Sequence, residues 1–228
     1  MSILWEQEVG STNYQVRQAG NSLRLYTNGV FHSQYNPGRP LTGSVWDLLF
    51  LPAFFYPPGS IRRVLVLGVG GGAVIQQLRR FIQPESIVGV ELNATHLYLA
   101  KRFFGVRGKD VELVRADAVD WVNQYRGPVF DIVIDDLFGH VDGETQRSVF
   151  AGRRWVSSLT RCLSTRTRRT ISYFTCSRSY GSKKSVATNS SSTTDSGLGL
   201  RQPCLRKTSC LPGEGLRVAK VASEMSNR

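Results

Sequence analysis

The feature that most constrains the fold is a regular change between apolar runs and glycine-rich or helical segments that begins near Arg62. Residues 64–67 read Val-Leu-Val-Leu, a continuous apolar run typical of a strand that is buried on both faces, as parallel strands are. A glycine-rich turn follows directly, and further strands and helices then alternate at short intervals. This alternation predicts an α/β fold, a doubly wound Rossmann-like parallel sheet.

The expected elements of this sheet follow one another in a fixed order. Strands are expected at 64–67, 86–91, 111–114 and 130–134, and helices around 73–82, 94–104 and 118–125.

The segment before the first parallel strand has a different pattern. Residues 1–40 contain short alternating runs separated by turn signals, among them Asn28-Gly29, and they predict a small antiparallel N-terminal β-sheet. Residues 42–56 are expected to form a buried helix that Pro57 and Pro58 end.

The charge of the chain is concentrated at one end. The formal net charge is +12, and such a charge would ordinarily indicate an anionic partner. Residues 1–150 hold 14 Lys and Arg against 14 Asp and Glu, a difference of zero, whereas residues 151–228 hold 15 against 3, a difference of +12. A nucleic acid is therefore expected as a partner only through this basic tail.

The tail also changes in composition. Residues 153–163 can form an amphipathic helix and residues 170–176 one more strand, but residues 177–228 show no periodicity and are expected to be poorly ordered. We therefore expect three parts, namely an N-terminal β-sheet subdomain at 1–40, a Rossmann-like domain at 41–164, and a basic Ser/Thr/Arg-rich tail at 165–228.

Several classes of protein are disfavoured by local features. The four cysteines, all after residue 150, have spacings that fit neither a zinc site nor a CxxC motif, so we expect no metal site. The apolar stretch at 45–56 has 12 residues and is too short to cross a bilayer. The N-terminus shows no secretory signal, and a cytoplasmic location without a membrane partner is expected.

The glycine-rich turn is the first candidate for a binding site. Gly68, Gly70 and Gly72 stand between a buried strand and a helix, which is the setting in which a glycine loop cradles a nucleotide. Glycines let the backbone turn sharply and approach a ligand closely, and the following helix offers unpaired amides.

Acidic residues follow the next three strands. Glu91 ends the second strand, Asp117 follows the third, and Asp135 and Asp136 end the fourth. A carboxylate in the place of Glu91 can accept both ribose hydroxyls, and one in the place of Asp117 can accept from the amine of adenine. Because ligands of open α/β sheets bind at the carboxyl ends of the strands, these acids point to one shared site.

Taken together, these motifs resemble a known set. Residues 64–72, 88–93, 115–118 and 130–136 look like consecutive motifs of class I S-adenosylmethionine-dependent methyltransferases. The N-terminal sheet, followed by a helix and the glycine loop, is similar to the layout of spermidine synthases. The resemblance covers about residues 5–150.

The resemblance implies a transferase that uses S-adenosylmethionine or its decarboxylated form as donor, with a small-molecule acceptor of unknown identity. Spermidine synthases often pair through their N-terminal sheets, so it also implies a homodimer. In the implied donor site, Gly68, Gly70 and Gly72 line the amino-acid side of the donor and Glu91 binds the ribose. Asp117 and Ala118 contact the adenine, and the catalytic Asp136 faces the reacting end.

Three positions depart from the spermidine synthase pattern. Gly139 stands where that family carries the aspartate that deprotonates the attacking amine, His32 replaces a glutamine, and Gly71 replaces the aspartate of the glycine loop. His140 is an alternative base. Because a dicationic polyamine needs carboxylates, the sequence favours methyl transfer over aminopropyl transfer.

Three other functions are also compatible with the sequence. The chain could be an aminopropyltransferase of polyamine synthesis, an NAD-dependent dehydrogenase, or an inactive nucleoside-binding protein. The dehydrogenase is suggested because Gly68, Gly70 and Ala73 satisfy GxGxxA and Glu91 follows about 20 residues on. A complete fold of the resembled class also needs a further helix and antiparallel strands after Phe150. We therefore hypothesise that the sequence beyond about Ser164 comes from a shifted reading frame, which translating the other frames of the coding DNA would test.

Overall fold

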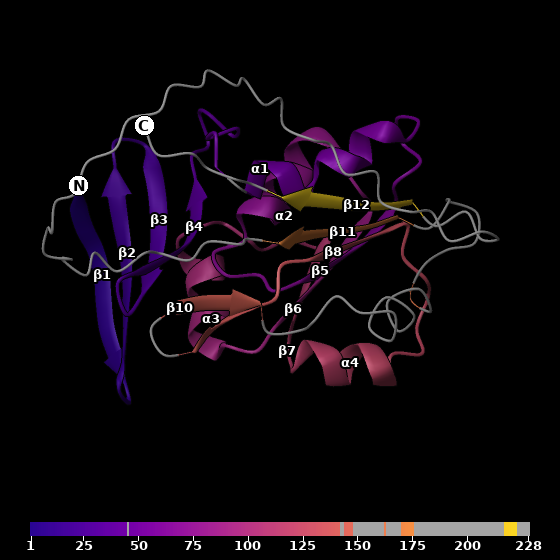
Figure 1. Cartoon of the computed structure of the whole chain (residues 1–228). Coiled ribbons are helices and arrows are strands. Elements are labelled where there is room, and N and C mark those ends of the chain that lie inside the picture. The colour runs from indigo at the N-terminus through magenta and orange to yellow at the C-terminus, as the bar shows by residue number, and fades with distance from the viewer. Residues whose placement is uncertain (45, 142–143, 148–161, 163–169, 176–216, 223–228) are drawn as a thin grey trace, which may run out of the picture.

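The computed structural model describes residues 1–44, 46–141, 144–147, 162, 170–175 and 217–222 of the chain. The first part is a four-stranded antiparallel sheet, which Figure 1 shows beside the α/β part. Its strands, in spatial order, are β1 (Ser2–Val9), β2 (Thr12–Ala19), β3 (Ser22–Thr27) and β4 (Val30–Tyr35). Asn28 and Gly29, both with positive φ, form the expected turn between β3 and β4. The small N-terminal sheet is confirmed.

The second part is a six-stranded sheet in which every described pair of strands is parallel. Its spatial order is β12-β11-β8-β5-β6-β7. The strands are β5 (Arg63–Leu67), β6 (Ser86–Glu91), β7 (Val111–Arg115), β8 (Ile132–Asp135), β11 (Thr170–Thr175) and β12 (Arg217–Ala222). The chain moves outward from β5 to β7 and then returns to place β8 on the other side of β5. This doubly wound order puts a ligand crevice at the carboxyl ends of β5 and β8.

Three helices connect the first four parallel strands. They are α2 (Ala73–Phe81), α3 (Ala94–Arg102) and α4 (Ala118–Gln124). Asn93 caps α3 by accepting hydrogen bonds from the amides of Thr95 and His96, whereas α2 begins after a left-handed Gly72 that offers no side chain. Strands and helices therefore occur where the periodicity predicts them, within one or two residues at most ends.

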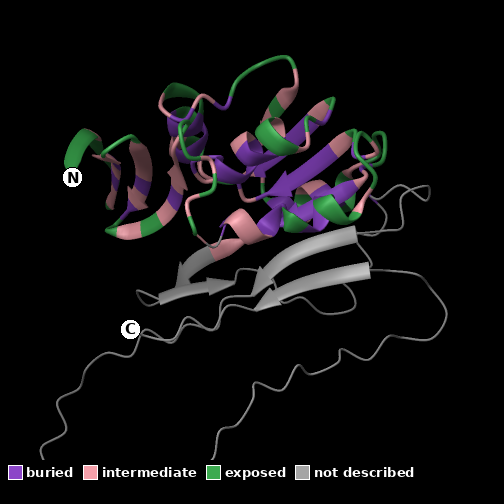
Figure 2. Ribbon diagram, turned by 90° about the horizontal axis from the view of Figure 1, so that it is seen from above, coloured by how far each residue is buried: buried purple, intermediate pink, exposed green. Residues whose placement is uncertain are grey.

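The hydrophobic core lies in two layers on opposite faces of the parallel sheet. Successive side chains of a strand point to opposite faces, so Val64 and Val66 pack in one cluster with α2, α3 and the N-terminal sheet. Leu65 and Leu67 pack in the other cluster with α4. Figure 2 shows the buried residues concentrated along these central strands. All four side chains are at most 1% exposed, and each such burial contributes about 1.5–3 kcal/mol.

The helix expected at 42–56 is wrong in its extent. The structure has a short helix α1 (Trp46–Leu49) and a 3-10 helix η1 (Leu51–Phe55) instead. Pro52 lies at the start of η1. Because proline has no amide hydrogen and its ring collides with the preceding turn, one helix cannot run through it.

The chain after β8 differs from the expectation in three ways. A hairpin of β9 (Phe138–Val141) and β10 (Glu144–Arg147) follows directly, where the sequence indicates a loop. The strand expected at 170–176 forms as β11, but it pairs parallel with β8, whereas a complete fold of the resembled class needs antiparallel strands after Phe150. A second strand, β12, forms within the tail, where no periodicity predicts it. The helix expected at 153–163 lies outside the described residues, apart from the buried Cys162.

Candidate functional site

The glycine loop connects β5 to α2 with a backbone that only glycine adopts readily. Gly68, Gly70 and Gly72 have φ values of +82°, +53° and +78°. A Cβ at Gly68 would overlap the backbone carbonyl of Asp136, and one at Gly72 would overlap the side chain of Val106. All three glycines are therefore favoured by conformation, and Gly68 and Gly72 are required by close contact as well.

The N-terminal sheet touches the same loop through β4. A Cβ at Gly70 would lie 3.4 Å from the backbone oxygen of His32. A Cβ at Gly71 would lie 2.8 Å from Cβ of Ser33, which is buried, and 3.2 Å from the ring of Phe104. An aspartate, which the resemblance to spermidine synthases would lead one to expect there, cannot stand at Gly71 without displacing these groups.

Glu91 lies at the end of β6, next to the glycine loop, and its side chain is 11% exposed. Its Oε2 accepts hydrogen bonds from the amides of Val69 at 2.9 Å and Gly70 at 3.0 Å. Its Oε1 accepts from the amide of Asn93 at 2.9 Å and lies 3.9 Å from Nδ1 of His96. The predicted ribose acceptor thus also braces the loop that would cradle the donor.

Asp117 is exposed and caps α4. Its Oδ1 accepts hydrogen bonds from the amides of Val119 at 2.8 Å and Asp120 at 3.1 Å. Ala118, beside it, is 7% exposed. The structure therefore gives Asp117 a local structural function, the cap of α4, that was not predicted from the sequence. The second carboxylate oxygen, Oδ2, belongs to the same exposed side chain.

The paired aspartates after β8 are placed differently. Asp135 is fully buried, and its Oδ1 accepts a hydrogen bond from the amide of Leu137. Asp136 is partly exposed, and its amide donates to the backbone oxygen of Leu67 at 2.8 Å. Asp136 is thereby held at the start of the glycine loop. Gly139 and His140 lie on β9, and the side chain of His140 falls outside the described part of the structure.

No sequence motif indicates a group of residues that joins the N-terminal sheet to the candidate site. Thr27 Oγ1 and His96 Nε2 share a buried hydrogen bond of 2.8 Å. Asn93 donates to the hydroxyl of Tyr14 at 2.7 Å, and the ring of His32 lies 5.0 Å from that of His96. Thr27 and His96 are 69 positions apart, so no local motif could have indicated this contact.

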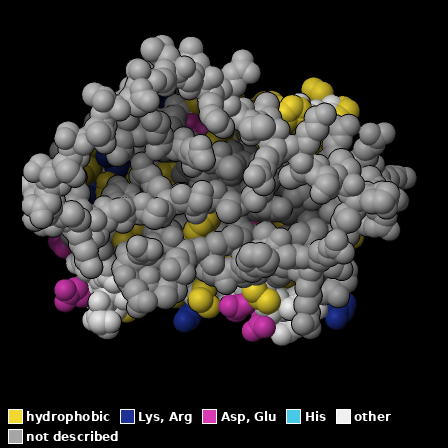
Figure 3. Space-filling model, in the orientation of Figure 1, with side chains coloured by type: hydrophobic (Ala, Val, Ile, Leu, Met, Phe, Trp, Pro, Cys, Tyr) yellow, Lys and Arg dark blue, Asp and Glu magenta, His cyan; other side chains and the backbone are white. Residues whose placement is uncertain are grey.

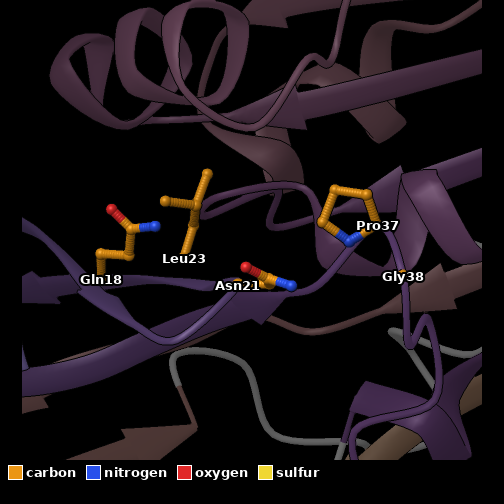
Figure 4. Close-up of a pocket in the computed structure, with 5 residues that line it drawn as sticks. All are labelled: Gln18, Asn21, Leu23, Pro37 and Gly38. Carbon is orange, nitrogen blue, oxygen red and sulfur yellow. The ribbon is translucent and has the colours of Figure 1, made fainter.

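A hollow of about 360 Å³ lies away from this site, at one end of the N-terminal sheet. Figure 4 shows its lining residues, Gln18, Asn21, Leu23, Pro37 and Gly38. None of them belongs to the glycine loop or carries a charge, so the hollow lacks the groups that a nucleotide donor needs. The carboxyl edge of the parallel sheet remains the better candidate.

Charges and metal ligands give no competing site in the described part of the chain. There, no group of three or more His, Cys, Asp or Glu side chains could hold a metal ion. On the face in Figure 3 the described acidic and basic side chains that can be seen are scattered, and several of both kinds lie along the lower rim. Among the described helices, none is both long and apolar enough to cross a membrane.

Comparisons with known proteins agree on this fold. Residues 64–157 match a family described as a methyltransferase domain. The chain is 31% identical over 100 residues to polyamine aminopropyltransferase 2 of Caldanaerobacter subterraneus, which covers 42% of this chain and 33% of that protein. It is 35% identical over 85 residues to a polyamine aminopropyltransferase of Synechococcus, and this match covers 35% of this chain and 27% of that protein. The matches thus span about a third of these relatives' length.

Solved structures show a likeness over a larger share of the chain. A probable spermidine synthase from Corynebacterium glutamicum superimposes with a TM-score of 0.57 at 18% identity, over 72% of this chain and 61% of that one. Spermidine synthase from Thermotoga maritima superimposes with a TM-score of 0.52 at 14% identity, over 71% of this chain and 53% of that one. The chain has the class I methyltransferase fold. More narrowly, within that fold the chain resembles these spermidine synthases.

Proposed function

We propose that the chain binds an S-adenosyl donor at the carboxyl edge of its parallel sheet and transfers a group from it to a small molecule. The observation that carries this proposal is the meeting of the glycine loop with Glu91, whose carboxylate lies 2.9–3.0 Å from the amides of Val69 and Gly70. Asp136 lies against Gly68 at the same edge. The fold and the curated relatives support a donor of this class.

The geometry limits how Glu91 can hold a ribose. A carboxylate offers about four lone-pair directions, and the amides of Val69, Gly70 and Asn93 occupy three of them. One direction remains for a ribose hydroxyl. Glu91 can therefore accept one hydroxyl while it keeps its bonds to the loop, and a second only by releasing an amide.

The remaining donor contacts follow the order that the resemblance implies. Gly68, Gly70 and Gly72 would line the amino-acid side of the donor, where the left-handed backbone lets the ligand approach closely. Asp117, exposed at the end of β7, would accept from the adenine amine while its other oxygen keeps the helix cap. Ala118 would pack beside the base.

Methyl transfer is the reaction we favour. The sulfonium of S-adenosylmethionine is already activated, and alignment of donor and acceptor can supply much of the rate without a strong base. Asp136, partly exposed at the end of β8, would face the reacting end. Gly139 offers no carboxylate to deprotonate an amine or pair with a polyamine ammonium group.

Aminopropyl transfer is the second candidate, because the curated relatives are named polyamine aminopropyltransferases. In that case the base must come from a residue other than Gly139, and His140 on β9 is the nearest candidate along the sequence. A homodimer and a nucleic acid bound by the basic tail are further partners that we propose from the resemblance and the charge.

The first test is a thermal-shift titration with S-adenosylmethionine, its decarboxylated form, methylthioadenosine and NAD. A ligand at 100 times its dissociation constant should raise the free energy of unfolding by about 2.7 kcal/mol. Stabilisation by the adenosyl-sulfur ligands supports the proposal, and the better of the two donors distinguishes methyl from aminopropyl transfer.

Two results would contradict it. Stabilisation by NAD alone would indicate the dehydrogenase, for which Gly68, Gly70 and Ala73 have the required spacing. No stabilisation by any of the four ligands would exclude a donor site in the chain as it stands. Donor binding without turnover of amines, nucleic acids or small molecules would favour an inactive nucleoside-binding protein.

A further inference from the structure

A buried polar chain runs from the N-terminal sheet to the glycine loop. Thr27, at the end of β3, is 7% exposed, and its hydroxyl lies 2.8 Å from Nε2 of His96. The other ring nitrogen of His96, Nδ1, lies 3.9 Å from Oε1 of Glu91. Oε2 of Glu91 accepts from the amides of Val69 and Gly70. The end of β3 is therefore linked through α3 and β6 to the glycine loop, although Thr27 and His96 are 69 positions apart.

The orientation of the His96 ring is fixed from several sides. Asn93 accepts a hydrogen bond from the His96 amide and caps the helix on which His96 lies. The ring of Tyr14 meets the imidazole edge-on at 5.8 Å between centroids, and the ring of His32 lies 5.0 Å away. The ring therefore has little freedom to turn without losing its contact to Thr27 or to Glu91.

The burial of both side chains strengthens the interaction between His96 and Glu91. The side chains of His96 and Glu91 are 9% and 11% exposed, so water screens little of the interaction between the imidazole and the carboxylate. The carboxylate must hold its two oxygens toward different amides while leaving one lone-pair direction for a ligand. A polar group close to Oε1 helps to select that one orientation.

We propose that His96, held by Thr27, is a positioning residue of the donor site, through which the N-terminal sheet orients Glu91 toward the ribose. The inference rests on the proposed function, since it assumes that Glu91 meets the ribose of an adenosyl ligand. Neither Thr27 nor His96 belongs to the glycine loop or to the acids that follow the strands. Their contribution to binding passes through Glu91.

The test measures dissociation constants by calorimetry for methylthioadenosine and for its 2′-deoxy and 3′-deoxy analogues. In the unchanged chain, loss of the hydroxyl that Glu91 accepts should weaken binding about tenfold or more. Thr27→Val removes the hydroxyl at nearly constant shape, and His96→Phe keeps an aromatic ring. Each should weaken methylthioadenosine binding about fivefold to tenfold and reduce the discrimination against the deoxy analogue.

Two controls separate positioning from general damage to the fold. Thr27→Ser keeps the hydroxyl and should restore the discrimination, whereas Thr12→Val makes the same chemical change elsewhere in the N-terminal sheet and should leave it unaltered. The double variant Thr27→Val/His96→Phe should bind no more weakly than His96→Phe alone, because both changes break one chain of contacts.

The outcomes are distinct. If Thr27→Val and His96→Phe weaken all three ligands equally and keep the discrimination, the positioning function is wrong while the donor site stands. If His96→Phe does not fold, the result for Thr27→Val decides. If the unchanged chain binds none of the three ligands, the proposed function fails, and this inference fails with it.

Discussion

The two acids at the ends of β6 and β7 are held in opposite ways. Glu91 is nearly buried, and its carboxylate accepts from loop amides 22 and 21 residues earlier in the chain. Asp117 is exposed and accepts from amides two and three residues further along. If the donor binds as proposed, the ribose side of the site, at Glu91, is therefore built by tertiary contacts, whereas the adenine side, at Asp117, is built by local ones.

This difference has a consequence for substitutions. A change on the ribose side should lower ligand affinity and the free energy of unfolding together, because the same bonds serve both. On the adenine side the two effects should separate, since a helix cap can be replaced by another cap.

Gly68→Ala should give the largest effect. The left-handed backbone alone costs about 1–2 kcal/mol for a residue with a Cβ, and the added atom would overlap the carbonyl of Asp136. We expect the free energy of unfolding to fall by about 3 kcal/mol or more. Denaturant unfolding measures the loss, and titration with adenosyl ligands should show no binding.

Gly29→Ala is the matched control for that change. Gly29 has φ +77°, but no other atom lies within 4 Å of the Cβ position. It should cost about 1–2 kcal/mol and leave ligand binding intact. Equal losses for the two variants would show that contact with Asp136 contributes nothing.

Glu91→Gln should have the second largest effect. Glutamine keeps one acceptor oxygen, so its NH₂ group must face either the Asn93 amide or the amides of Val69 and Gly70, and it cannot accept a hydrogen bond from any of them. A loss of about 2 kcal/mol in the free energy of unfolding and at least about tenfold in ligand affinity is expected. The control Glu112→Gln, at an exposed position on β7, should change neither the free energy of unfolding nor the ligand affinity. If Glu91→Gln is as stable as the unchanged chain and binds the ligand normally, the contacts of Glu91 with the loop do not build the ribose side.

Asp117→Ala should have the smallest effect on stability, about 1 kcal/mol, because it removes one helix cap. Asp117→Asn should keep that cap and the stability while it loses the charge that faces the ligand. Thermal unfolding and ligand titration of both variants, with Asp120→Ala as the control, measure the two effects separately. If Asp117→Asn is as unstable as Asp117→Ala, the helix cap alone does not account for the contribution of Asp117 to stability, and the separation of the two effects is contradicted.

The sequence predicts the parallel sheet well because buried parallel strands need continuous apolar runs. Val64 to Leu67 show such a run, and the glycines that follow have the backbone conformations that their position requires. Gly68 and Gly72 could be assigned to the loop from spacing alone. Their close contacts with Asp136 and Val106 could not, because those partners come from distant segments.

Of the features that were not predicted, one was contained in the local sequence and two were not. Pro52 divides the expected helix at 42–56, and its effect could have been predicted from the missing amide. The parallel pairing of β11 depends on where the chain returns to the sheet. Thr27 and His96 meet only because the N-terminal sheet docks on α3, so their pairing could not be predicted from either segment.

The contact between Gly71 and Ser33 restricts how this protein could evolve. A Cβ at Gly71 would meet buried Ser33 and the ring of Phe104. A mutation that restores the loop aspartate of spermidine synthases would therefore be harmful unless Ser33 or its strand had already changed. The substitutions are epistatic, and their order is constrained. A lineage that carries this packing is held at glycine by steric exclusion, whatever advantage a carboxylate there would bring.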